Sequence, residues 1–300
     1  MLCCGERVDG TVIVRTGRRL PGVPPVAGVH GPIAIVRMAV GDAYGAKEWR
    51  EGEGLDQTAY RIDRITRRHC RTVAEFSFRH AERLGAKVFG GPKYTISPVY
   101  EGMLKEELDA AATRYPHVRY EPQLIDATYA LLLANPGDAL VIPALNRDGD
   151  CLSDLVLQMF GSIAGAESLL LSFDESWNLR VVMAEAPHGT APSLFRKNLA
   201  NPMAMILAGA ALLSYIGDRA AAVAQAIMEA VFEAVSEGSP HRGPERPCHD
   251  DRVHGRGHQA HAHEAGELAE ASARRAVMGP TSFLLLHTRC YMSRSSALIA

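Results

Sequence analysis

The chain lacks several features that mark whole classes of protein. Its 32 basic and 34 acidic side chains nearly cancel, so no excess of positive charge predicts a nucleic-acid partner. The longest apolar run, MAMILAGAALLSYI from Met203, is too short to cross a bilayer and is typical of a buried helix. The N-terminus, MLCCGERVDG, lacks the apolar core of a signal peptide. We therefore expect a soluble protein without a membrane or nucleic-acid partner.

Cysteine pairs at metal-ligand spacing are also absent. The six cysteines are scattered, and the adjacent Cys3 and Cys4 do not have the spacing of a disulfide framework. This pattern predicts reduced thiols and a cytoplasmic location.

Short apolar runs alternate with longer helical patterns from Thr11 to about Gly238. The predicted strands are residues 11–15, 33–37, 86–90, 139–145 and 180–185. The predicted helices are residues 61–85, 98–115, 126–135, 149–161 and 201–218. Such alternation predicts an α/β fold with a largely parallel sheet.

The stretch from Ser239 to Glu267 differs in composition from the rest. It has almost no apolar residue, and six of the chain's 12 histidines lie between His241 and His263. Such a segment cannot bury enough surface to offset the entropy of ordering it, which predicts disorder.

Three acids crowd into the decapeptide NRDGDCLSDL, residues 146–155. Asp150 and Asp154 are four positions apart, so on a helix they share one face. Two carboxylates fixed in this way can offer several oxygens to Mg²⁺ or Mn²⁺. The alternative is an acidic first helical turn that faces water, which the helix dipole favours. The spacing alone leaves both interpretations open.

Several motifs around this decapeptide resemble those of one enzyme family. GDCLSDL resembles the metal-binding GDILSDL of the β-decarboxylating dehydrogenases, which include the isopropylmalate, isocitrate, homoisocitrate and tartrate dehydrogenases. EAPHGTAP, residues 185–192, resembles their EPVHGSAP adenosine loop, and ANPMAMILAGAALL from Ala200 resembles ANPxAxILSAAMML. LIDATYALLL and GGPKYTISP resemble xVDAMAMxLV and VDKANVL. The motifs keep the family's order, so their joint match is more specific than any one of them.

The N-terminal matches are looser. VRTGRRLPGV resembles NLRPAKxxPG and places Arg15 at a substrate-binding position. IVRMAVGDAY resembles VRExTxGxYxG and places Arg37 and Tyr44 seven residues apart, although MAVGD replaces the family's E-x-T-x-G. Without the resemblance, we would take these residues for solvated arginines and a half-buried packing tyrosine.

The resemblance implies an isopropylmalate dehydrogenase-like, two-domain α/β fold and a role for each matched residue. The expected ligands of a divalent cation, Mg²⁺ or Mn²⁺, are Asp126, Asp150 and Asp154. The expected substrate-binding residues are Arg15 and Arg37, and the expected catalytic residues are Lys93 and Tyr44. The expected residues of the cofactor site, for NAD with NADP as the alternative, are Asn146, His188, Gly189, Ser193 and Asn201.

The implied reaction is oxidative decarboxylation of a 2-hydroxy acid that carries a carboxylate on the neighbouring carbon. Lys93 would take the hydroxyl proton as hydride leaves for the nicotinamide, and Tyr44 would protonate the enolate left by CO₂. In the family, the Lys and Asp that match Lys93 and Asp126 reach the partner's site, so a homodimer with shared active sites is expected. Asp148 has no family role and is expected to be a solvated loop or cap residue.

The chain departs from the family pattern in three places. No strand-loop-helix with GDGIGPE precedes Arg15, so we expect an incomplete cofactor domain. The NAD-selecting Asp of the family is Ser193 here, with Arg196 nearby, which leaves NAD versus NADP open. The closing T-x-D-L-G-G motif is absent after Gly238.

The third departure has two explanations. A frameshift near Ser239 would account for the position, the composition and the lost motif together, and we favour it. The rival is a genuine metal-binding tract, whose ligands would be His254, His258, His261 and His263.

The expected organisation has four parts. Residues 1–10 are unassigned, 11–161 form a central substrate, metal and dimerisation domain, 162–238 are a remnant of the dinucleotide-binding domain, and 239–300 are the tail. Two functions remain open, an active dehydrogenase and a truncated, non-catalytic relic. The missing strands and MAVGD favour the relic, whereas the retained lysine and aspartates favour the enzyme.

Overall fold

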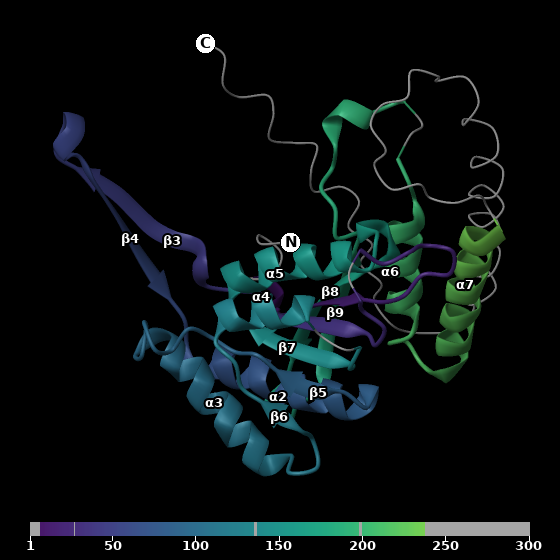
Figure 1. Ribbon diagram of the computed structural model, residues 1–300, viewed down its shortest axis with the longest axis horizontal. Coiled ribbons are helices and arrows are strands. Elements are labelled where there is room, and N and C mark those ends of the chain that lie inside the picture. The colour runs from purple at the N-terminus through teal and green to yellow at the C-terminus, as the bar shows by residue number, and fades with distance from the viewer. Residues whose placement is uncertain (1–6, 27, 135–136, 198–199, 238–300) are drawn as a thin grey trace.

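A seven-stranded sheet forms the centre of the computed structural model, which describes residues 7–26, 28–134, 137–197 and 200–237 (Figure 1). The strand order is β6-β5-β7-β2-β1-β8-β9. The strands are β1 (Val12–Gly17), β2 (Ile33–Met38), β5 (Lys87–Phe89), β6 (Tyr120–Glu121), β7 (Leu140–Ala144), β8 (Ser168–Phe173) and β9 (Leu179–Glu185).

The sheet is mixed rather than largely parallel. Strands β6, β5, β7 and β2 are parallel neighbours, whereas β2–β1, β1–β8 and β8–β9 are antiparallel pairs. Only a short turn at 174–178 joins β8 to β9, and such a turn cannot make the crossover that parallel strands need. The predicted α/β fold is confirmed, but the prediction of a largely parallel sheet was wrong for half of it.

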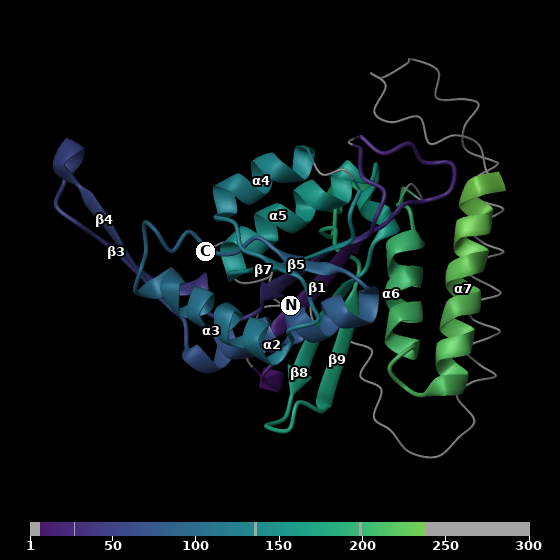
Figure 2. The ribbon, with the colours of Figure 1, turned by 60° about the horizontal axis from the view of Figure 1, so that its bottom comes forward.

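Helices cover both faces of the sheet (Figures 1 and 2). Helices α2 (Arg67–Leu84) and α3 (Tyr100–Arg114) pack on one face, and α4 (Ile125–Leu133) and α5 (Asn146–Met159) pack on the other. Each face of the sheet therefore has its own hydrophobic core. Along β2, Ala34 and Val36 pack in the core under α2 and α3, and Ile33 and Ile35 pack in the core under α4 and α5. Because both faces of β2 are buried, its sequence is almost wholly apolar.

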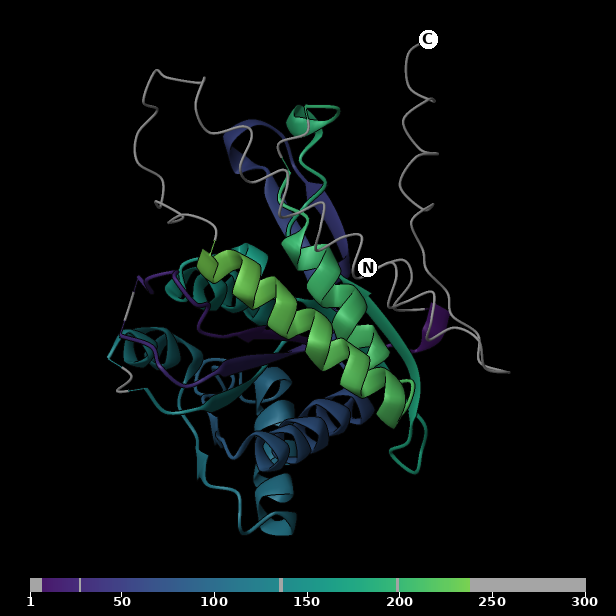
Figure 3. The same ribbon diagram turned by 90° about the vertical axis from the view of Figure 1, so that its right-hand side faces the viewer.

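Two further helices pack beside the end of the sheet. Helices α6 (Met203–Leu213) and α7 (Asp218–Glu237) lie side by side (Figure 3). They share a small core in which Leu20 meets Met203, Leu207 and Val231. The sheet is continuous across the domain boundary predicted after residue 161, because β1 pairs with β8. The division into domains therefore stays a prediction.

Strands β3 (Asp42–Glu51) and β4 (Thr58–Arg64) form a two-stranded arm that projects from the rest, with the short helix η1 (Gly54–Asp56) at its tip (Figure 1). The helix predicted from residue 61 was wrong over its first six positions. Arg61 to Arg64 belong to β4, and the Thr66 side chain caps α2 by accepting a hydrogen bond from His69 N (3.2 Å). The arm, the strands β6 and β8, and helix α7 were not predicted.

The remaining described segments add two short helices, η2 (Ile163–Gly165) and η3 (Pro192–Leu194). Among the helices that the structure describes, none is both long and apolar enough to cross a membrane. The histidine-rich stretch lies outside the described residues, so its disorder, the frameshift and the metal-binding tract stay predictions.

We predict that Gly31→Ala destabilises the protein by about 1–3 kcal/mol, the usual cost of overpacking. A methyl group at Gly31 would lie 2.6 Å from both Ala139 N and Gly137 O, and backbone atoms cannot yield as a flexible side chain can. Urea unfolding measures the effect. Gly28→Ala is the matched control, because nothing lies within 4 Å of a methyl group there. An equal loss of stability in both variants would contradict this account.

Candidate functional site

Helix α5 carries the predicted metal-binding acids on one face, as its sequence indicated. Arg15 Nη1 on β1 lies 3.7 Å from Asp150 Oδ1 and 3.2 Å from Asp154 Oδ1. The two carboxylate side chains are 36% and 62% exposed, so they converge at the edge of the protein rather than within its core. The predicted helix and the shared face of the two acids are confirmed.

The two predicted substrate arginines lie side by side under these acids. Arg15 stands opposite Ile35 in the β1–β2 pair, and Arg37 stands opposite Ile13, so the two arginines are diagonal neighbours on one face of the sheet. Their exposed fractions are only 9% and 5%. Burial, and then the nearby charge of Arg37, lower the pKa of Arg15. The arrangement places two buried cations in contact with two partly exposed anions.

Tyr44 joins this cluster from the start of β3. Its hydroxyl donates a hydrogen bond to Asp150 Oδ2, and Arg37 Nη1 forms an ion pair with Asp150 Oδ1. The Arg37 guanidinium also lies 5.0 Å from the centre of the Tyr44 ring. Burial and the hydrogen bond to Asp150 raise the pKa of Tyr44, which keeps its hydroxyl protonated at neutral pH.

Two serines that the sequence analysis missed hold Arg15. Arg15 Nη1 donates to Ser153 Oγ (2.9 Å), and Arg15 Nε donates to Ser168 Oγ (3.3 Å). Ser153 could have been found, because it lies three residues after Asp150 on the same helix. Ser168 gave no signal, because it reaches Arg15 only through the pairing of β1 with β8.

Asn146, predicted as a cofactor residue, is fully buried behind Arg37. Its amide oxygen accepts from Arg37 Nε (2.8 Å), and its amide nitrogen donates to Gly41 O (3.0 Å). Its role toward a cofactor stays a prediction. The expectation for Asp148 was wrong: α5 already begins at Asn146, the Asp148 side chain is only 22% exposed, and burial raises its pKa.

Lys93 and Asp126 form a separate pair. Lys93 follows β5, Asp126 lies in the first turn of α4, and Lys93 Nζ is ion-paired with Asp126 Oδ2. That contact lowers the pKa of Asp126. Among the described residues, no three acidic, histidine or cysteine side chains are placed to hold a metal ion. Within this part of the chain, Asp126 therefore does not join Asp150 and Asp154.

The donor chemistry at α5 fits a hard divalent cation in part. Mg²⁺ and Mn²⁺ favour carboxylate oxygens, and Mg²⁺ keeps several waters beside one or two carboxylates. Asp150 and Asp154 offer such oxygens at a solvent-accessible edge. The remaining ligands would come from water, a substrate or a second chain.

The predicted cofactor loop lies between β9 and α6. Glu185, at the end of β9, is paired with Ser168 and so begins the loop beside Arg15. The loop residues predicted to bind cofactor are all exposed: His188, Gly189, Ser193 and Asn201. Asn201 Oδ1 accepts from Met203 N (2.9 Å) at the start of α6. The structure does not bring these four residues together into a pocket among its described residues, so their role toward a cofactor stays a prediction.

Comparison with curated proteins shows similarity to several dehydrogenases. The isocitrate dehydrogenase [NADP] of Thermus thermophilus is 31% identical over 211 residues, which are 70% of this chain and 41% of that protein. The 3-isopropylmalate dehydrogenase of Methanothermobacter thermautotrophicus is 30% identical over 207 residues, 69% of this chain and 60% of that protein. The tartrate dehydrogenase/decarboxylase of Pseudomonas putida is 31% identical over 224 residues, which are 70% of this chain and 58% of that protein. The chain thus spans 41% to 60% of the length of these relatives.

Solved structures and a family model agree with these relatives. The isocitrate dehydrogenase from Methylococcus capsulatus superposes with a TM-score of 0.70 at 26% identity, over 86% of this chain and 73% of that one. The TT0538 protein from Thermus thermophilus superposes with a TM-score of 0.71 at 24% identity, over 94% of this chain and 53% of that one. At this identity, the similarity supports the fold alone. Residues 17–242 match the family model for isocitrate/isopropylmalate dehydrogenase. The chain belongs to the isocitrate/isopropylmalate dehydrogenase family.

Proposed function

We propose that this chain carries out the metal-dependent oxidative decarboxylation of a 2-hydroxy acid bearing a 3-carboxylate, with hydride transfer to NAD or, alternatively, NADP. The observation that carries the proposal is the convergence of Arg15, Arg37 and Tyr44 on Asp150, with Asp154 beside them. Family membership supports the reaction class, since the relatives include decarboxylating dehydrogenases.

The charges of the cluster favour a dicarboxylate substrate. The charges of two arginines and two aspartates sum to zero, and the arginines are buried whereas the aspartates reach solvent. A divalent cation bound to Asp150 and Asp154 would release the two guanidiniums, whose planar forks suit carboxylates. A dianionic substrate would then restore neutrality. The four side chains would thus be part of a neutral site both without ligands and with the cation and the substrate bound.

Each titratable residue has a chemical task in this proposal. Tyr44 holds a proton at neutral pH and can deliver it to carbon after CO₂ leaves. Lys93 of the partner subunit would take the proton of the substrate hydroxyl. When bound, the cofactor would accept hydride, and the cation would stabilise the negative charge that develops as CO₂ departs.

A homodimer would complete the site. Asp126 and Lys93 are exposed or half-buried and lie apart from Asp150 in the described part of the chain. Helix α4 also exposes Leu131 and Leu133, and the arm exposes Ile62. We assign these exposed apolar side chains to the surface that would meet a second copy. In that dimer, Asp126 of the partner subunit would supply the third carboxylate.

One observation favours a non-catalytic chain as the alternative. The acids already neutralise Arg15 and Arg37, so the cluster is electrically satisfied without any ligand. A relic that kept only the dimer surface could retain such a cluster as a set of internal ion pairs.

We predict that the chain reduces NAD or NADP in the presence of Mn²⁺ and at least one of malate, tartrate, isopropylmalate or isocitrate. The absorbance of the reduced cofactor measures this reaction.

We also predict that Asp150→Asn weakens Mn²⁺ binding, measured by calorimetry, by at least roughly tenfold, the loss typical of even indirect changes at metal sites. Asp148→Asn, on the same helix but turned away, is the control. Unchanged Mn²⁺ affinity in Asp150→Asn would remove the metal assignment, and Mn²⁺ binding without turnover would support the relic.

We predict that two inactive variants complement each other if the unmutated chain is active. An equal, refolded mixture of Lys93→Ala and Asp150→Ala chains should give one half mixed dimers. Each mixed dimer rebuilds one of its two sites, so about a quarter of the original activity is expected for a two-fold dimer. Either variant refolded alone is the control. A mixture as inactive as its components would show that each site is built within one chain.

We predict that Ser193→Asp shifts the cofactor preference toward NAD, because a carboxylate accepts the ribose 2′-hydroxyl and repels a 2′-phosphate. The measurement is the ratio of kcat/KM for NAD and NADP. Ser193→Asn has a similar shape without the charge and should shift the ratio less. Equal ratios in the three proteins would place Ser193 outside the cofactor site.

A further inference from the structure

The turn between β2 and β3 joins two residues of the candidate site. Arg37 stands near the end of β2, and Tyr44 near the start of β3. The turn between them has positive backbone angles, with φ of 71° at Gly41 and 59° at Asp42. Glycine adopts this left-handed region freely, but aspartate does so at some cost. Surrounding contacts must therefore hold Asp42 in place.

Asp42 is buried and bonded to two different helices. Its Oδ2 accepts from Arg147 N in the first turn of α5 (2.8 Å), and its Oδ1 accepts from the Tyr100 hydroxyl at the start of α3 (3.0 Å). The N-cap of α5 is Leu145, whose side chain cannot cap the helix. Asp42 thus satisfies a free N–H of α5 from another segment, where the helix dipole also favours a negative charge.

Asn146 forms a second link between the same turn and the same helix. It bonds to Gly41 O and to Arg37 Nε, so it connects the turn, the helix and the arginine. The contact between α5 and β2 is also close, because a methyl group at Gly149 would lie 2.7 Å from Arg37 Cβ. The turn and the first turn of α5 therefore fit together with little freedom.

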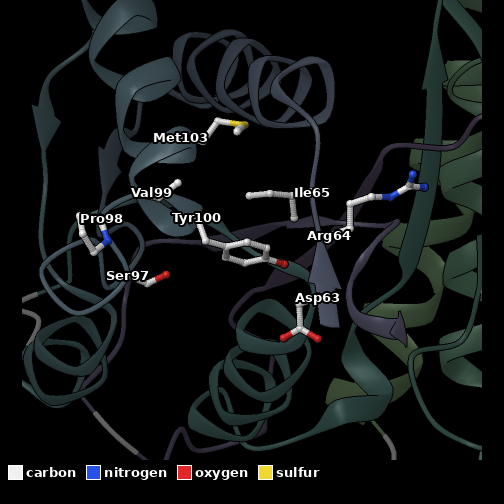
Figure 4. Close-up of a pocket in the computed structure, with 8 residues that line it drawn as sticks. All are labelled: Asp63, Arg64, Ile65, Ser97, Pro98, Val99, Tyr100 and Met103. Atoms are coloured by element: carbon white, nitrogen blue, oxygen red, sulfur yellow. The ribbon is translucent and has the colours of Figure 1, made fainter. Parts of the chain in front are cut away.

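Tyr100 extends the link to the segment of Lys93. Its ring lies between α3 and the end of β4, where it lines an open pocket of ≈ 340 Å³ (Figure 4). The next residue, Glu101, accepts a hydrogen bond from the backbone N–H of Lys93. Burial and the charge of Asp42 raise the pKa of Tyr100, so its hydroxyl remains a donor. Asp42 thereby contacts the helix that carries Asp150 and Asp154 and, through Tyr100 and Glu101, is linked to the backbone of Lys93.

We propose that Asp42 is a positioning residue, which works with Asn146 to hold the β2–β3 turn against α5 and so fixes Arg37 and Tyr44 opposite Asp150. The inference rests on the proposed function for the reaction that these groups serve. The positioning itself is a property of the folded chain and can be tested without activity.

Hydrogen exchange of the full chain separates positioning from general stability. In Asp42→Ala, the backbone amides of residues 38–46 and 146–150 should exchange faster. The amides of β7, and those of β2 as far as Val36, should stay protected from exchange. Asp56→Ala removes a charge at the exposed tip of the same arm and should leave both regions unchanged. Faster exchange throughout the sheet, or no change at the turn, would overturn the proposal.

Two milder variants keep the test decisive if Asp42→Ala does not fold. Asp42→Asn keeps an acceptor for Arg147 N and a polar partner for Tyr100, so it should restore most of the protection at the turn. Tyr100→Phe removes one of the two hydrogen bonds to Asp42, so the amides of the turn should exchange at a rate between those of the unmutated chain and Asp42→Ala. Protection in Asp42→Asn as low as in Asp42→Ala, or wild-type protection in Tyr100→Phe, would contradict the two-bond account.

Activity gives the second measurement and separates this inference from the proposed function. If the unmutated chain turns over substrate, Asp42→Ala should lower kcat/KM by roughly tenfold to a hundredfold, as displaced catalytic groups do, and Asp42→Asn should recover most of it. Full activity in Asp42→Ala would overturn the proposal. If the unmutated chain is inactive, the proposed function fails, and the exchange measurement alone decides the role of Asp42.

Discussion

Arg15 and Arg37 bring two positive charges into the interior of the sheet, at diagonal positions of the β1–β2 pair. An unpaired buried ion costs several kcal/mol, so the surrounding structure must neutralise both. Helix α5 does so with Asp150 and Asp154, and its close approach requires a glycine at position 149. The position of α5 is therefore linked to the charges beneath it.

The same constraint explains why the cluster suits a reaction with charged ligands. Its cations are buried and its anions are partly exposed, so a ligand that arrives from solvent meets the carboxylates first. A divalent cation and a dicarboxylate could replace the internal ion pairs without leaving net charge in the interior. Lys93 and Asp126, in contrast, neutralise each other nearer the surface, where the partner of the proposed homodimer would reach them.

The chain's repeated pattern of apolar runs and helices predicted much of the fold. IAIVR and ALVIPAL are apolar because β2 and β7 are covered on both faces, and that signal is local. The arm β3–β4 gave no such signal, because most of its residues are exposed and follow no apolar period. Its end was mistaken for the start of α2. The directions of the strands could not be predicted from the sequence either, because they depend on the antiparallel pairing of β1 with β2 and β8.

The sequence by itself determined that Asp150 and Asp154 share a face, because residues four apart on one helix are neighbours in any fold. Its motifs also indicated Arg15, Arg37 and Tyr44 as candidates. Only the tertiary structure decided that Arg15 meets Asp154, 139 residues away, and that Asp42 caps a helix that begins 104 residues later. These contacts depend on strand register, and a slip of one residue would turn every side chain to the opposite face.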